Sequence, residues 1–492
     1  MDLRPVKSKT SLSELASIVS GTCHMEATVT GITHNSRSVS PGDLFVALPG
    51  SNVHGIEYVD QALSNGAIAV ATDSTGYKSL DSKKVPCLEL TDARKDMAKL
   101  AAKIYGHPEN SLKIVGVTGT NGKTTTTHML RSIFLDSGAH VGVIGTLGTF
   151  LDLETIPSVR TTPESTDLFA LLAVMVEQGI THVFMEVSSH ALELDRVLGL
   201  QFDVAIFTNL TQDHLDFHGS MEHYFAAKAK LFTPSYAKAA VICIDDDWGK
   251  KLFAQVTIPA ISIGSQGDWQ TQLATSNSTG FTTQELQRAD GTNFSIEVNM
   301  LGAYNAVNAS CALAASEILG LPLQQGIKSI RNIRAIPGRL EEVIVSGLAR
   351  VIVDYAHTPD AVATALNAIR ESGVRKLITV IGCGGDRDSL KRPIMGRVAS
   401  QLSDVVIITD DNPRSEEPAE IRRQIMAGIA SESTQVFEVA NRREAIARAL
   451  NMAQRDDVVA ILGKGHESGQ EINGEIFPFD DRLVAVQESE LA

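Results

Sequence analysis

Short apolar runs alternate along the chain with longer stretches whose apolar residues recur at helical spacing. Such runs predict buried parallel strands, because strands that are covered on both faces are apolar throughout. The predicted strands are 112–117, 141–145, 182–187, 203–208, 239–244, 351–354, 377–382, 405–409 and 458–462. Helical patterns lie between them, for example from Thr124 to Gly138 and over 441–451. This alternation predicts an α/β fold with mostly parallel sheets covered by helices.

The length of 492 residues is too great for one hydrophobic core and predicts about three domains. Gly and Pro punctuate the chain at 105–108 and again at 336–338, which marks two boundaries. We predict a small N-terminal α/β domain, a central domain of the P-loop ATPase type with a parallel sheet, and a C-terminal Rossmann-like α/β domain. Their predicted ranges are 1–108, 109–335 and 336–492. The polar stretch 265–295 fits a loop or a weak β-meander.

Composition and charge exclude several classes of protein. No apolar run approaches the roughly 18 residues of a membrane helix, and the N-terminal MDLRPVKSKT lacks the apolar region of a secretory signal. The five cysteines have no metal-ligand spacing, so we expect free, mostly buried thiols in a cytoplasmic protein. The net charge of −15 argues against non-specific binding to nucleic acids or anionic membranes. An anionic substrate would therefore need local basic groups.

The segment 115–125, VGVTGTNGKTT, joins an apolar strand to a Gly-rich loop and the start of a helix. In such a loop the backbone N–H groups attract phosphate oxygens, a lysine neutralises the β- and γ-phosphates, and a hydroxyl ligates Mg²⁺. The strict G-x-x-x-x-G-K-[ST] pattern fails at one place, where Val117 replaces the first Gly. We expect Lys123 on an exposed part of the loop. The predicted ATP-binding residues are Gly119, Thr120, Asn121, Gly122, Lys123, Thr124 and Thr125.

Other polar residues follow strand ends, where ligands gather in parallel sheets. Glu186 ends an apolar strand, and a carboxylate beside a phosphate loop suits Mg²⁺, although a solvent-facing strand end is the alternative. The string DHLDFH at 213–218 looks like a metal cluster but, taken alone, is more typical of a hydrogen-bonded surface loop. Asn305 and Asn308 lie one helical turn apart, which also fits helix capping. The residue pattern alone predicts Lys228 as a solvated helix charge.

Several of these motifs resemble the Mur ligase family, whose members join amino acids to a carboxylate with consumption of ATP. The string TGTNGKTT is similar to their ATP loop, and DHLDFHGSMEHYFAAKAKLF is similar to their metal-binding string. The resemblance implies that Lys228 reacts with CO₂ to give N6-carboxylysine, and a buried neutral amine is nucleophilic enough for this reaction. It implies ATP contacts at Asn305, Asn308, Arg339 and Asp354. It implies Mg²⁺ ligands at Thr124, Glu186, His214 and Lys228, and a catalytic set of Lys123, Glu186, His214 and Lys228.

Two more strings narrow the resemblance to family members that add meso-diaminopimelate to UDP-N-acetylmuramoyl-L-alanyl-D-glutamate. SRSVSPGDLFVA at 36–47 is similar to the part that holds the uridine nucleotide, although alone it fits a solvated turn. DNPR at 411–414 is similar to the diaminopimelate signature, and an Arg fork with a Glu suits a zwitterionic end. The implied nucleotide-substrate contacts are Ser36, Ser51, Asn52, Val53, Thr161, Thr162, Ser188 and Arg196. The implied amino-acid contacts are Arg387, Asp411, Asn412, Pro413, Arg414, Gly463 and Glu467.

The implied reaction transfers the ATP γ-phosphate to the γ-carboxylate of D-Glu, and the diaminopimelate amine then attacks the acyl phosphate. Lysine in the same site would leave Arg414 as an unpaired charge. Two positions depart from the family pattern near the muramoyl peptide, Arg160 and Leu194. The alternatives are a lysine-adding member, another amide ligase such as a folylpolyglutamate synthetase, and a P-loop ATPase or kinase acting as a switch. The N-terminal string disfavours the folate enzyme, and we expect a monomer that binds small molecules.

Overall fold

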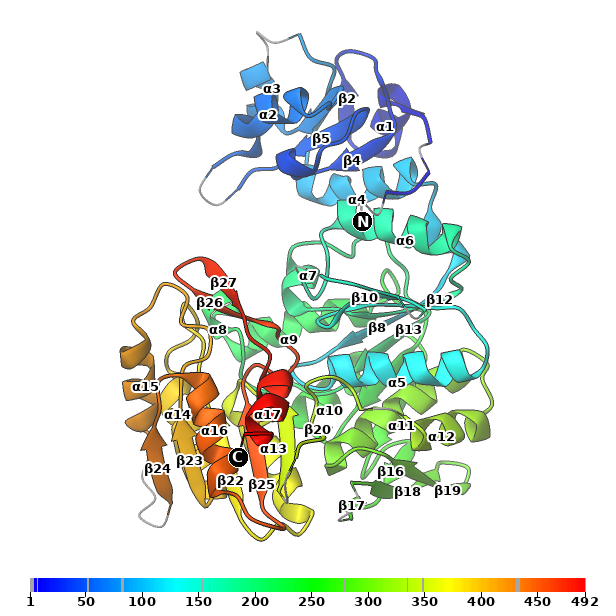
Figure 1. Ribbon diagram of the computed structural model, residues 1–492. Coiled ribbons are helices and arrows are strands. Elements are labelled where there is room, and N and C mark those ends of the chain that lie inside the picture. Colours follow the sequence, from blue (N-terminus) through cyan, green and yellow to red (C-terminus); the bar gives the residue numbers. More distant parts are fainter. Residues whose placement is uncertain are drawn as a thin grey trace.

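Three larger sheets organise the chain, and each is mostly parallel. Figure 1 shows the N-terminal part at the top, the central part below it, and the C-terminal part beside the central one. The computed structural model describes residues 4–6, 8–50, 53–80, 84–152, 154–158, 160–277, 280–333, 335–346, 349–429 and 434–491.

The N-terminal sheet has the strand order β2-β7-β6-β5-β4, in which only β2 and β7 pair antiparallel. Its strands are β2 (Gly21–Cys23), β4 (Gly31–Thr33), β5 (Asp43–Ala47), β6 (Ala69–Thr72) and β7 (Cys87–Leu90), and β1 (Thr10–Ser11) pairs with β3 (Thr28–Val29) beside it. The helices are α1 (Leu12–Ile18), η1 (Ser36–Ser38), η2 (Gly55–Tyr58), α2 (Val59–Ser64), α3 (Ser74–Leu80) and α4 (Ala93–Ile104). Leu100 and Ile104 of α4 belong to the same apolar cluster as Leu168 of the central part, so the two parts share a core.

The central sheet has the order β11-β10-β9-β12-β8-β13-β14-β15-β16-β18-β17, with β19 paired to β18. Its strands are β8 (Lys113–Thr118), β9 (Val141–Gly145), β10 (Gly148–Leu151), β11 (Glu154–Ile156), β12 (His182–Glu186), β13 (Val204–Phe207), β14 (Ala240–Cys243), β15 (Ala260–Gly264), β16 (Trp269–Thr271), β17 (Thr275–Ser276), β18 (Thr282–Arg288) and β19 (Asn293–Val298). The run from β9 to β16 in this order is parallel, whereas the stretch 269–298 pairs antiparallel. The antiparallel edge agrees with the β-meander alternative for 265–295.

Helices cover both faces of the central sheet (Figure 1), and α5 begins at Lys123, directly after the Gly-rich loop. They are η3 (Pro108–Ser111), α5 (Lys123–Asp136), α6 (Ser165–Glu177), α7 (Ser189–Glu193), α8 (Leu215–His218), α9 (Met221–Ala229), η4 (Lys230–Phe232), α10 (Asp247–Gln255), α11 (Ala303–Ile318) and α12 (Leu323–Arg331). Met129 and Ile133 of α5 pack with Ala309 of α11 in a second apolar cluster, which fixes the helix that follows the phosphate loop.

The C-terminal sheet has the order β20-β21-β25-β22-β23-β24, and only β20 runs antiparallel. Its strands are β20 (Glu341–Val343), β21 (Arg350–Asp354), β22 (Leu377–Ile381), β23 (Val405–Ile408), β24 (Gln435–Glu438) and β25 (Val458–Leu462). The helices are α13 (Pro359–Glu371), α14 (Lys391–Leu402), α15 (Pro418–Met426), α16 (Arg442–Met452) and α17 (Asp481–Ser489). A separate hairpin of β26 (Gly469–Ile472) and β27 (Glu475–Pro478) stands at the upper end of this part in Figure 1.

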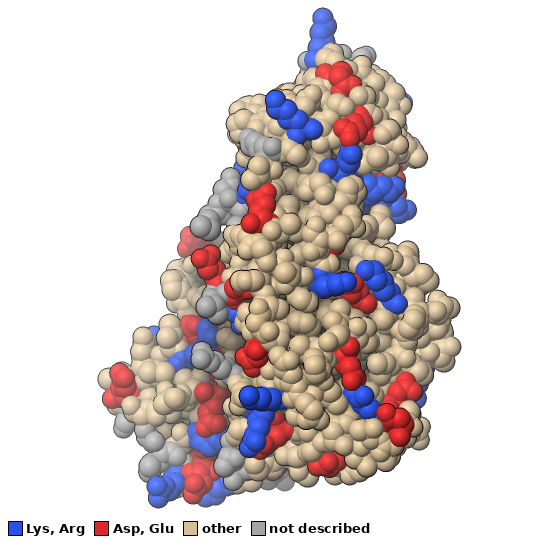
Figure 2. Space-filling view, turned by 90° about the vertical axis from the view of Figure 1, so that its right-hand side faces the viewer, with Lys and Arg blue, Asp and Glu red and all other residues tan. Residues whose placement is uncertain are grey.

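Charges of both signs mix on the surface, and the thiols are unpaired. Figure 2 shows positive and negative side chains interspersed over one face, without a large patch of one sign. None of the helices formed by the described residues combines the length and apolarity that a membrane crossing needs. All five cysteines are free, and four of them are buried.

Candidate active site

A cavity of about 530 Å³ lies where the central and C-terminal parts meet. The strand ends of the central sheet form one wall, and α13 with the end of β21 forms the other. The cavity brings together most residues that the sequence assigned to ATP and Mg²⁺. Those in its lining are Thr120, Asn121, Gly122, Lys123, Thr124, Thr125, Glu186, His214, Lys228, Asn305, Asn308, Arg339 and Asp354.

The phosphate loop has a conformation that requires glycine at two positions. Gly119 and Gly122 have φ angles of +150° and +87°, a region that residues with a Cβ rarely adopt. A Cβ on Gly122 would also lie 2.5 Å from Oδ1 of Asn308, so the loop and α11 approach each other directly. The backbone N–H of Thr120 donates to the carbonyl of Asn209 at 3.0 Å, which anchors the loop to the next strand end.

The expectation that Lys123 lies on an exposed part of the loop is wrong. Lys123 begins α5 and is half-buried. Its Nζ donates to the carbonyls of Gly119 at 2.9 Å and Thr120 at 2.8 Å. Burial lowers the pKa of Lys123, and Glu186 and Asp213 partly offset this shift. The Lys123 side chain therefore folds back on its own loop, whose carbonyls accept from the ammonium group.

Glu186 faces the loop and is buried, so the alternative that it points to solvent is wrong. Its Oε1 accepts hydrogen bonds from Thr124 Oγ1 at 3.0 Å and from the backbone N–H of Thr146 at 2.8 Å. Across the domain boundary, Arg339 Nη2 donates to the same Thr124 hydroxyl at 2.9 Å. A buried carboxylate beside a hydroxyl supplies the hard oxygen ligands that Mg²⁺ prefers. Among the described residues, no three His, Cys, Asp or Glu side chains form a closed metal cluster.

Lys228 is buried, with 1% of its surface exposed, so its pattern-based assignment as a solvated charge is wrong. Its Nζ donates to the carbonyl of Gly119 at 2.8 Å and lies 4.7 Å from the centre of the Tyr224 ring. Burial and the nearby Lys123 hold the pKa of Lys228 well below its usual range. Within the described part of the chain, no carboxylate forms an ion pair with it. Its neighbour Lys230, by contrast, is 41% exposed and pairs with Glu193.

His214 stands on the same side of the cavity, at the start of α8, with a left-handed φ of +53°. Its Nε2 lies 3.3 Å from Oδ2 of Asp213, and its ring meets that of His190 edge-on at 4.8 Å. Burial lowers the pKa of His214 to about 4, which leaves the imidazole neutral and able to ligate a metal ion at neutral pH.

The remaining predicted ATP contacts come from both walls. Asn305 and Asn308 are buried on α11, and Asn308 Nδ2 donates to Oδ1 of Asn305 at 3.4 Å. Asp354 accepts from the backbone N–H groups of Leu340 at 2.7 Å and Ala356 at 2.8 Å, so it caps the turn after β21. Burial raises the pKa of Asp354, and Arg339 partly offsets this.

The predicted contacts to the nucleotide substrate are only partly brought together. Thr161 and Ser188 line the cavity, and Thr162 lies beside Ser188 at 3.3 Å. Arg196 forms an ion pair with the buried Glu164 at 2.8 Å. Ser36 is buried and donates to Gln61 at 2.7 Å, so this hydroxyl is engaged inside the N-terminal part. Val53 is 48% exposed, whereas Ser51 and Asn52 lie outside the described residues.

Arg160, which departs from the family pattern, joins the cluster around Glu164. It lies 3.5 Å from Oε1 of Glu164, while Arg94 of α4 contacts Oε2 at 2.5 Å. Burial raises the pKa of Glu164, but Arg196 and Arg94 outweigh it and hold the pKa below its usual range. The cluster ties the N-terminal part to the central one.

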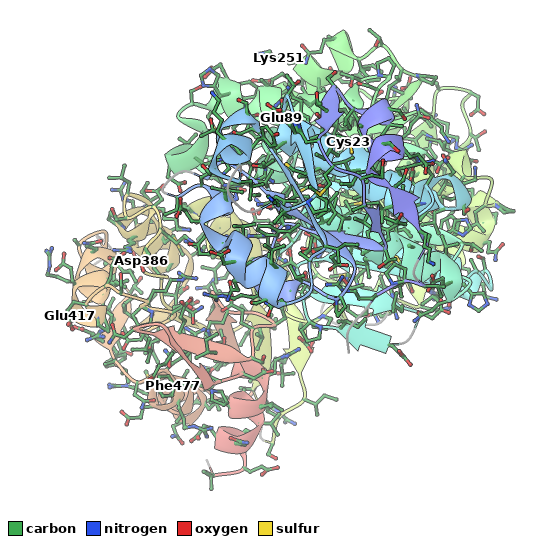
Figure 3. All side chains as sticks on the ribbon, turned by 90° about the horizontal axis from the view of Figure 1, so that it is seen from above. Cys23, Glu89, Lys251, Asp386, Glu417 and Phe477 are labelled. Carbon is green, nitrogen blue, oxygen red and sulfur yellow. The ribbon has the colours of Figure 1, made fainter. Side chains whose placement is uncertain are left out.

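The predicted amino-acid contacts gather at the strand ends of the C-terminal sheet. Arg414 has a left-handed φ of +52°, and its Nε donates to Glu471 at 3.0 Å while Nη1 donates to the carbonyl of Gly385 at 2.7 Å. Arg414 is therefore paired inside the protein, which corrects the expectation that lysine would leave it unpaired. Arg387 is exposed and donates to the carbonyl of Asp386. Figure 3 shows Asp386 and, on the hairpin, Phe477 in the C-terminal part.

Asn412 and Glu467 contact each other, with Asn412 Nδ2 donating to Glu467 Oε2 at 2.8 Å. Asp411 and Pro413 are buried beside them, and a Cβ on Gly463 would lie 2.6 Å from Oδ2 of Asp411. Sequence reasoning missed Lys464 and Glu471, which hold this site, and Thr146, which holds Glu186 beside the phosphate loop. Lys464 lies in the string GKGHE at 463–467, between the predicted contacts Gly463 and Glu467. This position was the available signal.

Family models match three consecutive segments of the chain. They are described as the Mur ligase family catalytic domain over 28–105, the Mur ligase middle domain over 117–316, and the Mur ligase glutamate ligase domain over 338–465. The chain is 43% identical to the UDP-N-acetylmuramoyl-L-alanyl-D-glutamate–2,6-diaminopimelate ligase of Streptomyces avermitilis, covering 98% of this chain and 97% of that protein. It is 42% identical to the enzyme of the same name from Aquifex aeolicus, covering 93% and 92%.

Solved structures give the same result. A UDP-N-acetylmuramoyl-L-alanyl-D-glutamate–2,6-diaminopimelate ligase superposes with a TM-score of 0.70 at 31% identity, covering 98% of this chain and 99% of that chain. MurF of Thermotoga maritima in complex with ADP superposes with a TM-score of 0.63 at 21% identity, covering 94% and 96%, and shows the shared fold. With these matches along its length and its phosphate loop, Glu186 and Lys228 in one cavity, the chain belongs to the Mur ligase family.

Proposed function

We propose that the protein catalyses the ATP-dependent addition of meso-diaminopimelate to UDP-N-acetylmuramoyl-L-alanyl-D-glutamate, a step of peptidoglycan precursor synthesis. The observation that carries the proposal is the position of the amino-acid loops against the ATP cavity. A Cβ on Gly465, in the loop that holds Glu467, would lie 2.7 Å from Cβ of Tyr355 in the cavity wall. Relatives that are 40–43% identical over more than nine-tenths of the chain carry the name of this activity.

Three functional domains follow from this proposal. The N-terminal domain, 1–108, binds the uridine nucleotide, the central domain, 109–335, binds ATP, and the C-terminal domain, 336–492, binds the amino acid. The proposed boundaries fall between the sheets, since β7 ends at Leu90, β8 begins at Lys113 and β20 begins at Glu341. We propose a monomer as the active form, since the cavity is lined by residues of both the central and the C-terminal domain of one chain.

The protein's contribution to catalysis is positioning and charge neutralisation, as in other phosphoryl transfers. When ATP binds, the ammonium group of Lys123 exchanges the loop carbonyls for oxygens of the β- and γ-phosphates. Arg339, which already reaches Thr124 from the C-terminal domain, places a second positive charge beside the transferring phosphoryl group. The γ-phosphate moves to the γ-carboxylate of D-Glu, and ADP leaves. The amine of diaminopimelate then displaces phosphate from the acyl phosphate to form the amide.

Mg²⁺ fits the oxygen atoms found beside the loop. Thr124 Oγ1 and Glu186 Oε1 are 3.0 Å apart and buried, and His214 provides a neutral nitrogen nearby. We propose that Thr124 and Glu186 hold one ion and that His214 with a modified Lys228 holds a second. Bound Mg²⁺ would neutralise the phosphate oxygens during transfer.

We propose that Lys228 carries a carbamate. Its amine is buried, lies close to Lys123 and lacks a carboxylate partner among the described residues, so burial favours its neutral form, and CO₂ would convert that neutral amine into an anion that Lys123 stabilises. The carbamate forms when the neutral amine attacks the carbon of CO₂ and releases one proton. The product provides the oxygen ligands that Mg²⁺ prefers.

Lysine is the second candidate amino acid, and one observation supports it. Because Arg414 is paired with Glu471, the guanidinium group of Arg414 would keep a partner when lysine is bound. The deciding assay offers ATP, the UDP-muramoyl dipeptide and either diaminopimelate or lysine, with phosphate release and the coupled product as readouts. We expect turnover with diaminopimelate and little with lysine. ATP hydrolysis that is independent of both acceptors would instead indicate a switch ATPase.

A further inference from the structure

Lys464 is a fully buried lysine in the loop between Gly463 and Glu467, with none of its surface exposed. Burying an ammonium group is costly unless every N–H finds an acceptor. Its Nζ donates to Asn412 Oδ1 at 3.0 Å, to Glu467 Oε2 at 3.1 Å and to the carbonyl of Gly469 at 2.6 Å. An ammonium group has three donors, so Lys464 has none left for a ligand.

Lys464 fixes which way the Asn412 amide points. Oδ1 of Asn412 receives one hydrogen bond from Lys464 and another from the backbone N–H of Glu471 at 3.0 Å. Both partners are donors only, so the atom that they share must be the oxygen. The amide nitrogen consequently faces Glu467 Oε2. Across the described part of the chain no hydrogen bond reaches Oε1 of Glu467, which is the oxygen left for an ammonium group of a ligand.

We propose that Lys464 is a positioning residue for the distal, zwitterionic end of the amino-acid substrate. It holds Asn412 and Glu467 in the orientation that presents an N–H donor and a carboxylate oxygen to that end. Through Gly469 it also fixes the base of the β26–β27 hairpin, whose Glu471 pairs with Arg414. This inference rests on the proposed function, since it assigns the substrate of that same site.

The first test replaces Lys464 with Met, which keeps the length of the side chain and removes the charge and donors. We expect KM for diaminopimelate to rise by at least about 10-fold, the size of losing one charge-assisted hydrogen bond. KM for ATP and for the UDP-muramoyl dipeptide should change by less than about 2-fold, because those ligands bind other loops. The ratio of kcat/KM for diaminopimelate to that for lysine should fall.

The matched control is Arg375→Met. Arg375 forms an ion pair at 2.7 Å with the fully buried Asp457, just before β25 and at the opposite end of that strand from the loop of Lys464. Its loss also leaves a buried charge without a partner, so it should lower Tm as Lys464→Met does. It should leave all three KM values unchanged. An equal rise of KM in both variants would show that Lys464 acts only through stability and would overturn the proposal.

A double-mutant cycle tests the route through Asn412. If Lys464 acts by orienting that amide, Asn412→Ala and Lys464→Met should be non-additive, and the double variant should bind diaminopimelate little worse than Asn412→Ala alone. Additive effects would overturn the route. If Lys464→Met does not fold, Lys464→Arg takes its place in the cycle. It retains the charge, but its planar fork cannot meet three converging acceptors, so KM should still rise.

The outcomes separate this inference from the proposed function. A wild-type protein that fails to use diaminopimelate contradicts the proposed function, whatever the variants do. A wild-type protein that uses diaminopimelate, with an unchanged KM in Lys464→Met or Lys464→Arg, contradicts only the role of Lys464.

Discussion

Two buried lysines, Lys228 at the phosphate loop and Lys464 in the loop after β25, have different surroundings. Lys228, at the phosphate loop, reaches a backbone carbonyl and lies close to a second cation, Lys123. Lys464, at the amino-acid loops, meets three acceptors, one of them the carboxylate of Glu467, and Asp411 lies 3.8 Å away. Both are at most 1% exposed. Burial alone therefore does not indicate what a lysine does.

The difference lies in charge compensation. A buried cation without an anionic partner is driven towards its neutral form, and a neutral amine is a nucleophile. A buried cation with its donors satisfied is stable as it stands and holds its neighbours in place. The same residue type thus suits chemical modification at one site and rigid positioning at the other.

The largest expected effect comes from removing Lys123, the cation close to Lys228. Lys123→Ala should lower kcat by about 10²–10³-fold, because it removes one electrostatic stabiliser from the phosphoryl transfer. Tm should change little, since Lys123 donates only to two carbonyls of its own loop. Steady-state kinetics and a thermal melt measure both quantities. Normal turnover in the folded variant would remove Lys123 from the mechanism.

Carbon dioxide separates the two buried lysines directly. With ¹³C-bicarbonate we expect one carbamate resonance in the wild type and in Lys464→Met, and none in Lys228→Ala. Lys228→Ala should also lower kcat by about 10²-fold through loss of a metal ligand. A carbamate signal that persists in Lys228→Ala and disappears in Lys464→Met would reverse the comparison.

The amino-acid side can be tested at Arg414. Arg414→Ala should lower kcat/KM for diaminopimelate by about 10–100-fold, because a charge-assisted donor is lost and Glu471 is left to repel the distal carboxylate. The KM of the UDP-muramoyl dipeptide should stay the same. Arg414→Lys is the control that keeps the charge but not the fork. If both variants retain the wild-type preference for diaminopimelate over lysine, the turn at 411–414 does not select the amino acid.

The smallest expected effect concerns His466, which lies between the two sites. Burial, with Arg339 and Arg482, lowers the pKa of His466 to about 4, against an ordinary value of about 6.5. Between these pH values the unfolded chain binds more protons at this residue than the folded one. The free energy of unfolding should therefore rise with pH across that window, by on the order of 1–3 kcal/mol.

Urea unfolding between pH 4 and 7 measures this contribution. His466→Gln should remove that part of the pH slope. Identical slopes for wild type and His466→Gln would show that folding does not disfavour the protonated form of His466.

Much of the fold was predictable because its strands are apolar throughout. The predicted ranges 141–145 and 458–462 coincide with β9 and β25, and the other predicted strands differ by one or two residues at their ends. Such runs are unambiguous when helices cover both faces of a sheet. The antiparallel pairing within 269–298 does not follow from the sequence, since its polar residues alternate too weakly to fix a register.

The site was predictable where a residue's role is local and not where it depends on distant partners. The phosphate loop is a contiguous string, and its strand and helix follow from the sequence. The burial of Lys228 depends on the strand ends that surround α9, so its helical context gave no sign of it. Lys464 finds an acceptor on Asn412, 52 residues away, and Arg414 finds Glu471, 57 residues away. Such pairs appear only when the sheet brings their loops together.

In the proposed amino-acid site, a carboxylate of the ligand would compete with Glu471 for the guanidinium group of Arg414. Glu471 is tethered beside the guanidinium, and a tethered group acts at an effective concentration on the order of millimolar. A free carboxylate must outcompete this resident one, which a lone carboxyl group at lower concentration does poorly. A ligand that also brings an ammonium group to Glu467 gains a second attachment that Glu471 cannot match. If this turn holds the amino acid as proposed, the chain's own carboxylate would screen out simple organic acids and admit molecules that carry both charges at the right spacing.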